Sequence, residues 1–353
     1  IFCVVVSVIP SKKLILSSAI ATVLATSANV QAAKITENVE LYGKFNISLT
    51  QSEESTGGVA STDAWKLNSH ASRIGIKGKK DLGNGLTGIF KYEFQASADD
   101  FSKDSGGDKN SGLTQRNTYI GLKGSFGKVI AGIHDTPLKM SQGKIDQFND
   151  LEGDIKKIFT KSEKRLGNSI IYMSPSFSGI KINAGLIAGE GVTDHDGDGD
   201  ATNDDSFSDA ISIAASYKNK GLYAAVALDN KVKGFDNVRL SAQYKIGKMA
   251  AIGAIYNRTE DSTSGSTGEE SGFLISAYMN VGSGKIKLQY GTTENDINAT
   301  TSTDLTTLSV GYDHKLAKST KLYAYYTNNE TDKTGSTSDK DNTYLGFGVV
   351  HKF

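Results

Sequence analysis

The sequence is poor in cysteine, proline and long apolar runs. Among 353 residues it has one cysteine, Cys3, and three prolines. A single thiol cannot form an internal disulfide, so the chain must be stabilised in another way. From Asn38 onward there is no run of 18 apolar residues, which excludes a transmembrane helix in that part of the chain. Basic and acidic residues number 39 each, and this balance gives no reason to expect nucleic acid as a partner.

Glycine and aromatic residues are abundant instead. The chain has 38 glycines, 15 tyrosines and 14 phenylalanines. Many short strands joined by glycine-containing turns give this composition, whereas a helical bundle does not. A closed β-sheet pairs every backbone polar group and would stabilise a long chain without disulfides.

The N-terminal segment has the pattern of a secretory signal peptide. Lys12 and Lys13 precede a short apolar run over residues 14–24. Residues 30–32 then form a small-residue cleavage pattern. The apolar run is shorter than the roughly 20 residues that a spanning helix needs. We therefore expect residues 1–32 to be a signal peptide.

The remainder of the chain is expected to be one domain. Residues 33–353 are predicted to form the β-barrel described below, and residues 1–10 are interpreted as an upstream extension from an over-long start assignment. The alternative is that residues 1–24 form a single membrane anchor. Lys12 and Lys13 interrupt that segment, which favours the signal peptide.

Apolar and polar residues alternate over long stretches of the chain. In residues 38–49, Val39, Phe45 and Ile47 share one face of an extended chain. The same alternation occurs around residues 238–246 and 285–290. A period of two over eight to twelve residues predicts β-strands.

The breaks between these strands alternate between short and long. The short breaks are residues 81–85, 124–127, 174–179, 218–221, 246–248, 281–284 and 316–320. The long polar segments are residues 51–63, 98–112, 136–164, 189–207, 231–236, 259–271, 294–304 and 329–342. Seven short and eight long connections predict an all-β fold, a transmembrane antiparallel barrel of sixteen strands with short periplasmic turns and long external loops.

The apolar face of these strands needs a partner. No helical period in the sequence supplies a covering layer, so we expect lipid against Phe45 and Leu240, and water beside Lys44 and Lys245. A soluble β-sandwich would show similar alternation. The strict short–long rhythm and the aromatic residues near strand ends favour the membrane barrel.

Five motifs resemble the general porins of Gram-negative bacteria, a family of trimeric sixteen-stranded outer-membrane channels. The motifs occupy residues 41–44, 72–94, 115–132, 168–180 and 343–353. The resemblance covers about residues 39–353. It implies a homotrimer with membrane lipid, lipopolysaccharide, periplasmic chaperones and the barrel-insertion machinery as partners. It also implies that the terminal aromatic residue, Phe353, is the signal that this machinery reads.

The resemblance further implies a pore narrowed by the third external loop, which folds into the lumen. The matching segment is residues 136–164, the longest connection. In the family, acidic residues of this loop face basic residues of the wall. The residues that match by motif position are Asp146 and Asp150 on the loop and Lys44, Arg73, Arg116 and Arg165 on the wall.

The residues themselves support this assignment unevenly. Alternation places Lys44 and Arg73 on the polar face, but it does not decide the face of Arg116, and Arg165 lies at a loop-to-strand edge. The family's Pro-Glu-Phe-Gly-Gly segment is replaced here by QFNDLEGD at residues 147–154.

A calcium site is a second hypothesis. Acidic residues at alternating positions with interspersed glycines resemble the start of an EF-hand loop, and the candidate ligands are Asp194, Asp196, Asp198, Asp200 and Asp205. The twelfth position is an aspartate rather than the usual glutamate. The alternative is an acidic surface loop without a metal. No other cofactor is expected.

The sequence thus predicts a channel for passive diffusion of ions and small hydrophilic solutes. The alternatives are a substrate-selective channel, or an adhesin or structural barrel with a plugged lumen. An enzyme is not expected, because the histidines are scattered and no nucleophile elbow, HExxH or P-loop motif occurs. The expected wall residues are mostly basic and the loops acid-rich, which leaves the sign of ion selectivity open.

Overall fold

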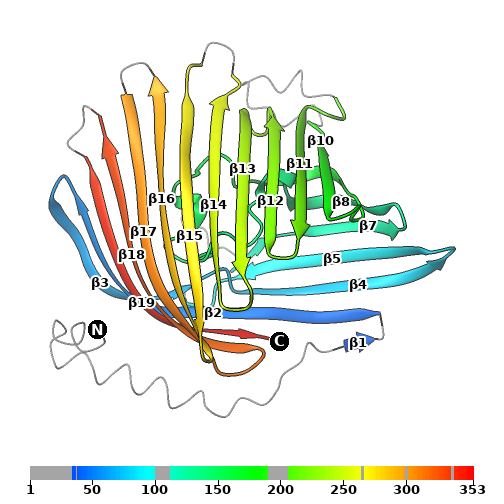
Figure 1. The fold of residues 1–353 in the computed structure, drawn as a ribbon, viewed down its shortest axis with the longest axis horizontal. Helices are drawn as coiled ribbons and strands as arrows, with labels where there is room; N and C mark the ends of the chain where they lie inside the picture. Colours follow the sequence, from blue (N-terminus) through cyan, green and yellow to red (C-terminus); the bar gives the residue numbers. More distant parts are fainter. Residues whose placement is uncertain are drawn as a thin grey trace.

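The computed structural model describes residues 34–36, 38–99, 112–189, 206–263, 266–298, 301–334 and 338–353. The expected signal peptide, up to residue 32, and the candidate calcium segment, residues 194–205, lie outside this part of the chain. No helix within the described residues is long and apolar enough to cross a membrane. The strands form one antiparallel sheet that closes on itself (Figure 1).

The elements follow one another around the barrel in chain order. They are β1 (Lys34–Thr36), β2 (Val39–Thr56), β3 (Val59–Ser69), β4 (Arg73–Gly83), β5 (Leu86–Ala96), β6 (Leu113–Gln115), β7 (Thr118–Gly124), β8 (Gly127–Asp135), α2 (Pro137–Met140), the 3-10 helix η2 (Ile155–Lys157), β9 (Arg165–Met173), β10 (Ile180–Ile187), β11 (Ala210–Asn219), β12 (Leu222–Asn230), β13 (Phe235–Ile246), β14 (Ala250–Asp261), β15 (Glu269–Val281), β16 (Gly284–Asn298), β17 (Thr301–Lys315), β18 (Thr320–Lys333) and β19 (Lys340–Lys352).

The predicted sixteen-stranded barrel is confirmed. β3 and β4 both pair with β2 and make one wall position, interrupted at residues 70–72, where Ala71 has a φ of 49°. β6 and β7 likewise share one position beside β5. The short β1 only extends the pairing of β2. β19 pairs with β2 over thirteen residues, from Lys340 to Lys352, and closes the barrel.

Several predicted long loops are strand instead. The prediction of a loop over residues 51–63 is wrong, because only Gly57 and Gly58 separate β2 from β3, with φ of 59° and 76°. The predicted loop at residues 294–304 is wrong for the same reason, since β16 and β17 meet there. Beyond the membrane both faces of a strand meet water, so apolar alternation stops while strand pairing continues.

The two faces of the wall differ as alternation predicts. Large apolar side chains such as Phe45, Leu67 and Ile120 are exposed on the outside. Polar side chains such as Thr50 and Gln289 are buried on the inside. An apolar outside and a polar inside suit a barrel set in lipid.

Segment 136–164 lies against the inner wall and is visible as the green coil behind β13 and β14 (Figure 1). The wall side chains of Ser276, Gln289 and Asn329 donate hydrogen bonds to backbone carbonyls of the segment. Its apolar side chains pack on Ile255 and Leu274. Those side chains are Ile145, Ile155, Ile158 and Phe159.

Glycines in the wall make room for this packing. A side chain at Gly291 would overlap Ile158, and a Cβ at Gly311 would lie 2.9 Å from the ring of Phe148. Both glycines are in strands, where glycine is otherwise unfavourable. The segment therefore rests in a shaped recess of the wall.

A buried ion pair fixes the far end of the segment. Nη1 of Arg239, in β13, donates to Oε1 of Glu163 at 2.6 Å, and Nη2 donates to the Ser162 hydroxyl at 2.7 Å. Nε donates to Asn257 at 2.9 Å, and the guanidinium lies 5.6 Å from the Phe159 ring centroid. Each guanidinium nitrogen therefore has a partner, which a buried charge requires.

Glu163→Gln tests this anchor. Removing the carboxylate leaves the guanidinium of Arg239 buried without its counter-charge, so the free energy of unfolding should fall by about 3 kcal/mol. Urea unfolding of the folded barrel measures the change. The control is Glu54→Gln, whose exposed partner Lys66 lies 3.6 Å away, and which should cost under about 1 kcal/mol. Equal losses in the two variants would contradict the anchoring role.

Candidate functional site

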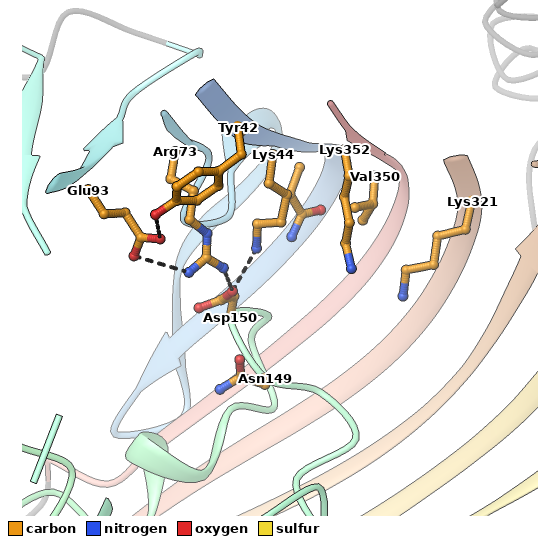
Figure 2. Close-up of a pocket in the computed structure, with 11 residues that line it drawn as sticks. Tyr42, Lys44, Arg73, Glu93, Asn149, Asp150, Lys321, Val350 and Lys352 are labelled. Atoms are coloured by element: carbon orange, nitrogen blue, oxygen red, sulfur yellow. Dashed lines mark hydrogen bonds and ion pairs between the residues drawn. The ribbon is translucent and has the colours of Figure 1, made fainter. Parts of the chain in front are cut away.

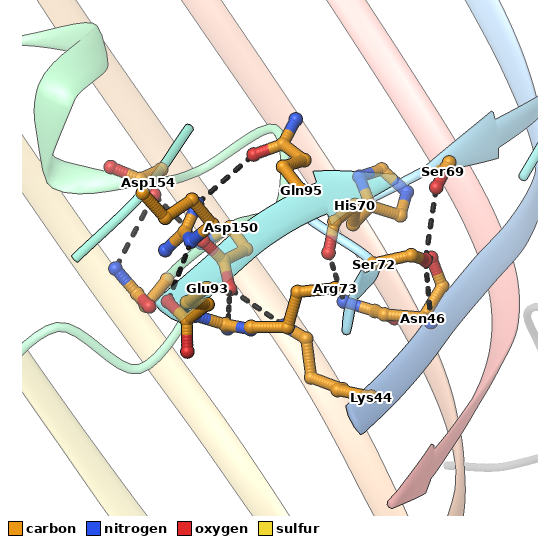
Figure 3. Close-up of polar contacts among 12 residues, drawn as sticks. Lys44, Asn46, Ser69, His70, Ser72, Arg73, Glu93, Gln95, Asp150 and Asp154 are labelled. Carbon is orange, nitrogen blue, oxygen red and sulfur yellow. Dashed lines mark hydrogen bonds and ion pairs between the residues drawn. The ribbon is translucent and has the colours of Figure 1, made fainter. Parts of the chain in front are cut away.

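The tip of segment 136–164 presents one carboxylate to the wall. Asp150 has a φ of 68°, a left-handed conformation that Asp tolerates better than most residues. Its backbone N–H donates to Oδ2 of Asp154 at 2.7 Å, and the same carboxylate accepts the Lys156 N–H. Asp154 thus holds the turn that aims Asp150 outward from the segment (Figure 3).

Asp150 faces two cations of the wall (Figure 2). Its Oδ2 lies 2.7 Å from Nζ of Lys44 and 3.1 Å from Nη2 of Arg73. Lys44 and Arg73 are direct cross-strand neighbours on β2 and β4. Burial alone would raise the pKa of Asp150, but the charge and hydrogen bond of Lys44 and the charge of Arg73 hold it below its usual value. Asp150 is therefore ionised at neutral pH.

Glu93 is a second acid that the sequence reasoning missed. Its carboxylate lies 3.0 Å from Nε of Arg116 and 3.1 Å from Nζ of Lys91, and it accepts the Tyr42 hydroxyl at 2.9 Å. Nη1 of Arg73 lies 3.8 Å from Oε1 of Glu93, so Arg73 links Glu93 to Asp150. Aromatic and polar residues alternate along β5, which predicts that Glu93 lies on the inner face. This pattern could have identified Glu93 as a lumen residue.

Arg165 belongs to an adjacent cluster. Its Nη2 lies 3.0 Å from Oδ1 of Asp135, and its Nε donates to Asn117 at 2.7 Å. Lys139 reaches the same carboxylate at 3.4 Å. Asp135, the last residue of β8, was also missed, because a strand-end acid next to a long polar segment has no distinguishing pattern.

The structure places Asp146 apart from these clusters. Its Oδ1 accepts the Phe148 N–H at 2.9 Å and its Oδ2 accepts the Ile155 N–H at 3.1 Å, so it closes a turn within the segment. Burial raises the pKa of Asp146, and the nearby charge of Asp154 raises it further. Sequence position alone does not distinguish this role from that of Asp150.

Two cavities meet at the ion pairs that Asp150 makes with Lys44 and Arg73. One, of about 450 Å³, is lined by Lys44, Lys321 and Lys352 among others. The other, of about 540 Å³, is lined by Arg116 and Arg165 among others. Arg73, Asn149 and Asp150 line both cavities, so they lie between them.

The terminal aromatic residue packs on the outside of the first strand. The ring of Phe353 lies 5.8 Å from that of Phe45 and covers Gly43, where an added Cβ would overlap the Phe353 ring. The Gly43 N–H donates to the Phe353 carbonyl at 2.9 Å. The last residue thereby completes the seam between β19 and β2; its role as an insertion signal stays a prediction.

No group of ligating side chains in the described residues could hold a metal ion.

Comparisons with known proteins agree with this architecture. The family model described as Gram-negative porin matches residues 18–334. The major outer membrane protein P.IB of Neisseria gonorrhoeae is 29% identical over 200 residues, which are 54% of this chain and 51% of that protein. The chain thus matches about half the length of that curated relative.

Solved structures share the fold. The anion-selective porin from Comamonas acidovorans superposes with a TM-score of 0.68 at 22% identity, covering 89% of this chain and 99% of that one. The trimer form of OmpT, an outer membrane protein of Vibrio cholerae, gives a TM-score of 0.67 at 17% identity, with coverages of 89% and 99%. With the closed sixteen-stranded barrel and a family match over most of its length, the chain belongs to the Gram-negative porins of the outer membrane.

Proposed function

We propose that the chain forms a water-filled channel for passive diffusion of ions and small hydrophilic solutes. The observation that carries this proposal is the position of Arg73 and Asp150 between two cavities inside a closed barrel. Solutes passing from one cavity to the other move along these charged groups. Segment 136–164 is, in this proposal, the loop that narrows the lumen.

The ion pairs beside the passage act on what moves along them. Asp150 projects from the segment and contacts Lys44 and Arg73 of the wall. The local field of these charges orders neighbouring water dipoles, which penalises apolar solutes and favours small polar ones.

The balance of charges favours anions. The two cavities are lined by nine cations and six acids. The cations are Lys44, Arg73, Arg116, Lys139, Lys156, Lys157, Arg165, Lys321 and Lys352, and the acids are Glu93, Asp135, Asp150, Glu152, Asp154 and Glu163. A ring with excess positive charge attracts anions and repels cations.

A homotrimer is part of the proposal. The trimer form of OmpT, which shares the fold, supports this assembly. The exposed apolar outer face supports contact with lipid and lipopolysaccharide. Periplasmic chaperones and the insertion machinery, acting on Phe353, are the proposed partners during assembly. A channel of this kind needs no catalytic group, and no enzymatic activity is proposed.

Recording from single trimers in planar bilayers, with a panel of salts and sugars, tests the function. We expect ohmic conductance that grows with salt concentration. A saturable block by one solute would contradict passive diffusion and support a substrate-selective channel. Correctly folded trimers that do not conduct would instead support a structural or adhesive barrel.

Asp150→Asn and Asp146→Asn distinguish the two acids of the segment. A unit charge about 7 Å from a passing ion in water changes its energy by about 0.6 kcal/mol before screening. At about 0.1 M salt, screening roughly halves this energy at that distance. Loss of the Asp150 charge changes the energies of an anion and of a cation by this amount in opposite directions, so the anion-to-cation permeability ratio should rise about threefold. Asp146→Asn should leave the ratio unchanged, because Asp146 bonds within the segment. Reversal potentials in a salt gradient measure the ratio, and equal shifts would contradict the assignment.

The lowered pKa of Asp150 gives a second test. A carboxyl whose pKa lies below 3.8 stays ionised until the pH falls below that value. The difference in permeability ratio between the wild type and Asp150→Asn should therefore be the same at pH 5 as at pH 7, and should vanish only below about pH 3.8. Comparing the two proteins at each pH removes the titration of groups that do not interact with Asp150. A difference already lost at pH 5 would contradict the close pairing with Lys44 and Arg73.

A further inference from the structure

One glutamine of the wall holds both ends of the loop that carries Asp150. Oε1 of Gln289, in β16, accepts the Gln147 N–H at 2.8 Å, and Nε2 donates to the Gly153 carbonyl at 2.7 Å. Gln147 and Gly153 each lie three residues from Asp150. Residues 147–153 are called here the tip loop. A single side chain thus closes the tip loop at its base, with Asp150 at the centre.

The side chain of Gln289 suits this position because it offers both an acceptor and a donor. It is 0% exposed, so neither polar atom can turn to water. The amide satisfies an N–H at one end of the tip loop and a carbonyl at the other. Loss of the amide would leave two buried backbone groups unsatisfied, which is costly. We therefore expect the tip loop to move toward water when the amide is removed.

A second residue of β16 strengthens the first end of the tip loop. Nζ of Lys287 donates to the Gln147 carbonyl at 3.1 Å. Both backbone polar groups of Gln147 are therefore bonded to β16. Lys287 is held in turn by Asp313, 3.0 Å away, and by the ring of Phe148, whose centroid lies 4.6 Å from Nζ. These contacts fix this end of the tip loop to the wall.

The other end of the tip loop depends on a glycine. A Cβ at Gly153 would overlap the hydroxyl of Ser309, in β17. That hydroxyl is itself bonded to Thr327 of β18 at 2.8 Å, so it is not free to turn aside. Because glycine has no Cβ, the backbone can approach the wall closely enough for its carbonyl to reach Gln289.

The tip loop is fixed to one sector of the barrel and carries its charge to another. Three strands, β17, β18 and β19, separate β16 from β2 in the sheet. Asp150 nevertheless bonds to Lys44 of β2 and Arg73 of β4 (Figure 2). The position of the carboxylate in the lumen therefore depends on how firmly β16 holds the base of the tip loop.

We propose that Gln289 is a positioning residue that sets the ion selectivity of the channel without touching a solute. It acts by holding the tip loop where Asp150 reaches Lys44 and Arg73. This inference rests on the proposed channel and adds a wall residue, outside the ion pairs of the passage, on which the effect of Asp150 depends.

Gln289→Met tests the proposal, because methionine is similar in length to glutamine but lacks its amide. A carboxylate that moves from about 7 Å to about 10 Å from a passing ion keeps roughly half of its screened effect. The anion-to-cation permeability ratio should therefore rise about twofold, less than in Asp150→Asn. Reversal potentials of whole-protein trimers in a salt gradient measure the ratio. An unchanged ratio would overturn the proposal.

Gln243→Met is the matched control. Gln243, in β13, is also a buried glutamine of the inner wall, and its Nε2 donates to the Lys144 carbonyl at 2.9 Å. That carbonyl lies outside the tip loop, so the control should leave the permeability ratio unchanged. An equal rise in both variants would mean that any loosening of segment 136–164 has this effect, and would remove the specific role of Gln289.

A double variant separates positioning from a purely structural role. In the Asp150→Asn background, Gln289→Met should not change the permeability ratio further, because no charge is left to displace. A second twofold rise there would show that Gln289 acts independently of Asp150, against the proposal.

Gly153→Ala reaches the same contact from the segment and serves where Gln289→Met does not assemble. The added Cβ should push the backbone from Ser309 and away from Gln289, and the ratio should again rise about twofold, for the same electrostatic reason. Trimers that resist dissociation in cold detergent show that each variant is folded. A folded Gly153→Ala trimer with the wild-type ratio would contradict the proposal.

Failure of the channel and failure of the positioning role give different results. A wild-type barrel that carries no current in concentrated KCl removes the proposed channel itself. A conducting barrel whose ratio does not respond to Asp150→Asn removes the passage. A barrel that responds to Asp150→Asn but not to Gln289→Met removes only the role of Gln289.

Discussion

Closure of the sheet is the constraint on which the other features depend. In lipid no water is present to satisfy an unpaired backbone group, so every strand needs two neighbours. The pairing of β19 with β2 meets this requirement, and Phe353 covers Gly43 at the same seam. Once the sheet is closed, alternate side chains must face either lipid or the lumen. The polar lumen therefore follows from closure of the sheet, independently of its function.

A polar lumen alone does not make a selective passage. In the proposed channel, segment 136–164 narrows the lumen, and apolar contacts hold the segment within the barrel. Ile158 and Phe148 rest on glycines of β16 and β17, and Arg239 with Glu163 fixes the far end of the segment. The contacts of Ile158 and Phe148 carry no charge. They leave Asp150 at the tip as the group that meets Lys44 and Arg73. In the proposed channel, stability and selectivity are thus divided between different residues of one segment.

Alternation predicted the features that obey closure and failed where closure is interrupted. It placed Lys44 and Arg73 on the inner face because β2 and β4 are regular there. It could not place Arg116, which lies in the gap between β6 and β7, where strand parity is not continuous. Asp146 and Asp150 differ in backbone conformation and hydrogen bonding. Their spacing of four residues in the sequence does not predict this difference. The hairpin ends were predicted as loops because their strands lack an apolar face.

The charges left outside the passage divide by end. At the short-turn end the inner face carries Lys128 opposite Lys123, whereas at the long-loop end the outer face carries acids opposite acids, as in Glu53 with Asp63 and Glu330 with Asp341. Both arrangements cost free energy in the sheet, because like charges in register repel. The outer acids face solvent, where water and salt screen them. The inner lysines face a confined lumen, where screening comes from the ions that pass. The same repulsion is therefore screened by bulk solvent at one end and confined to the lumen at the other.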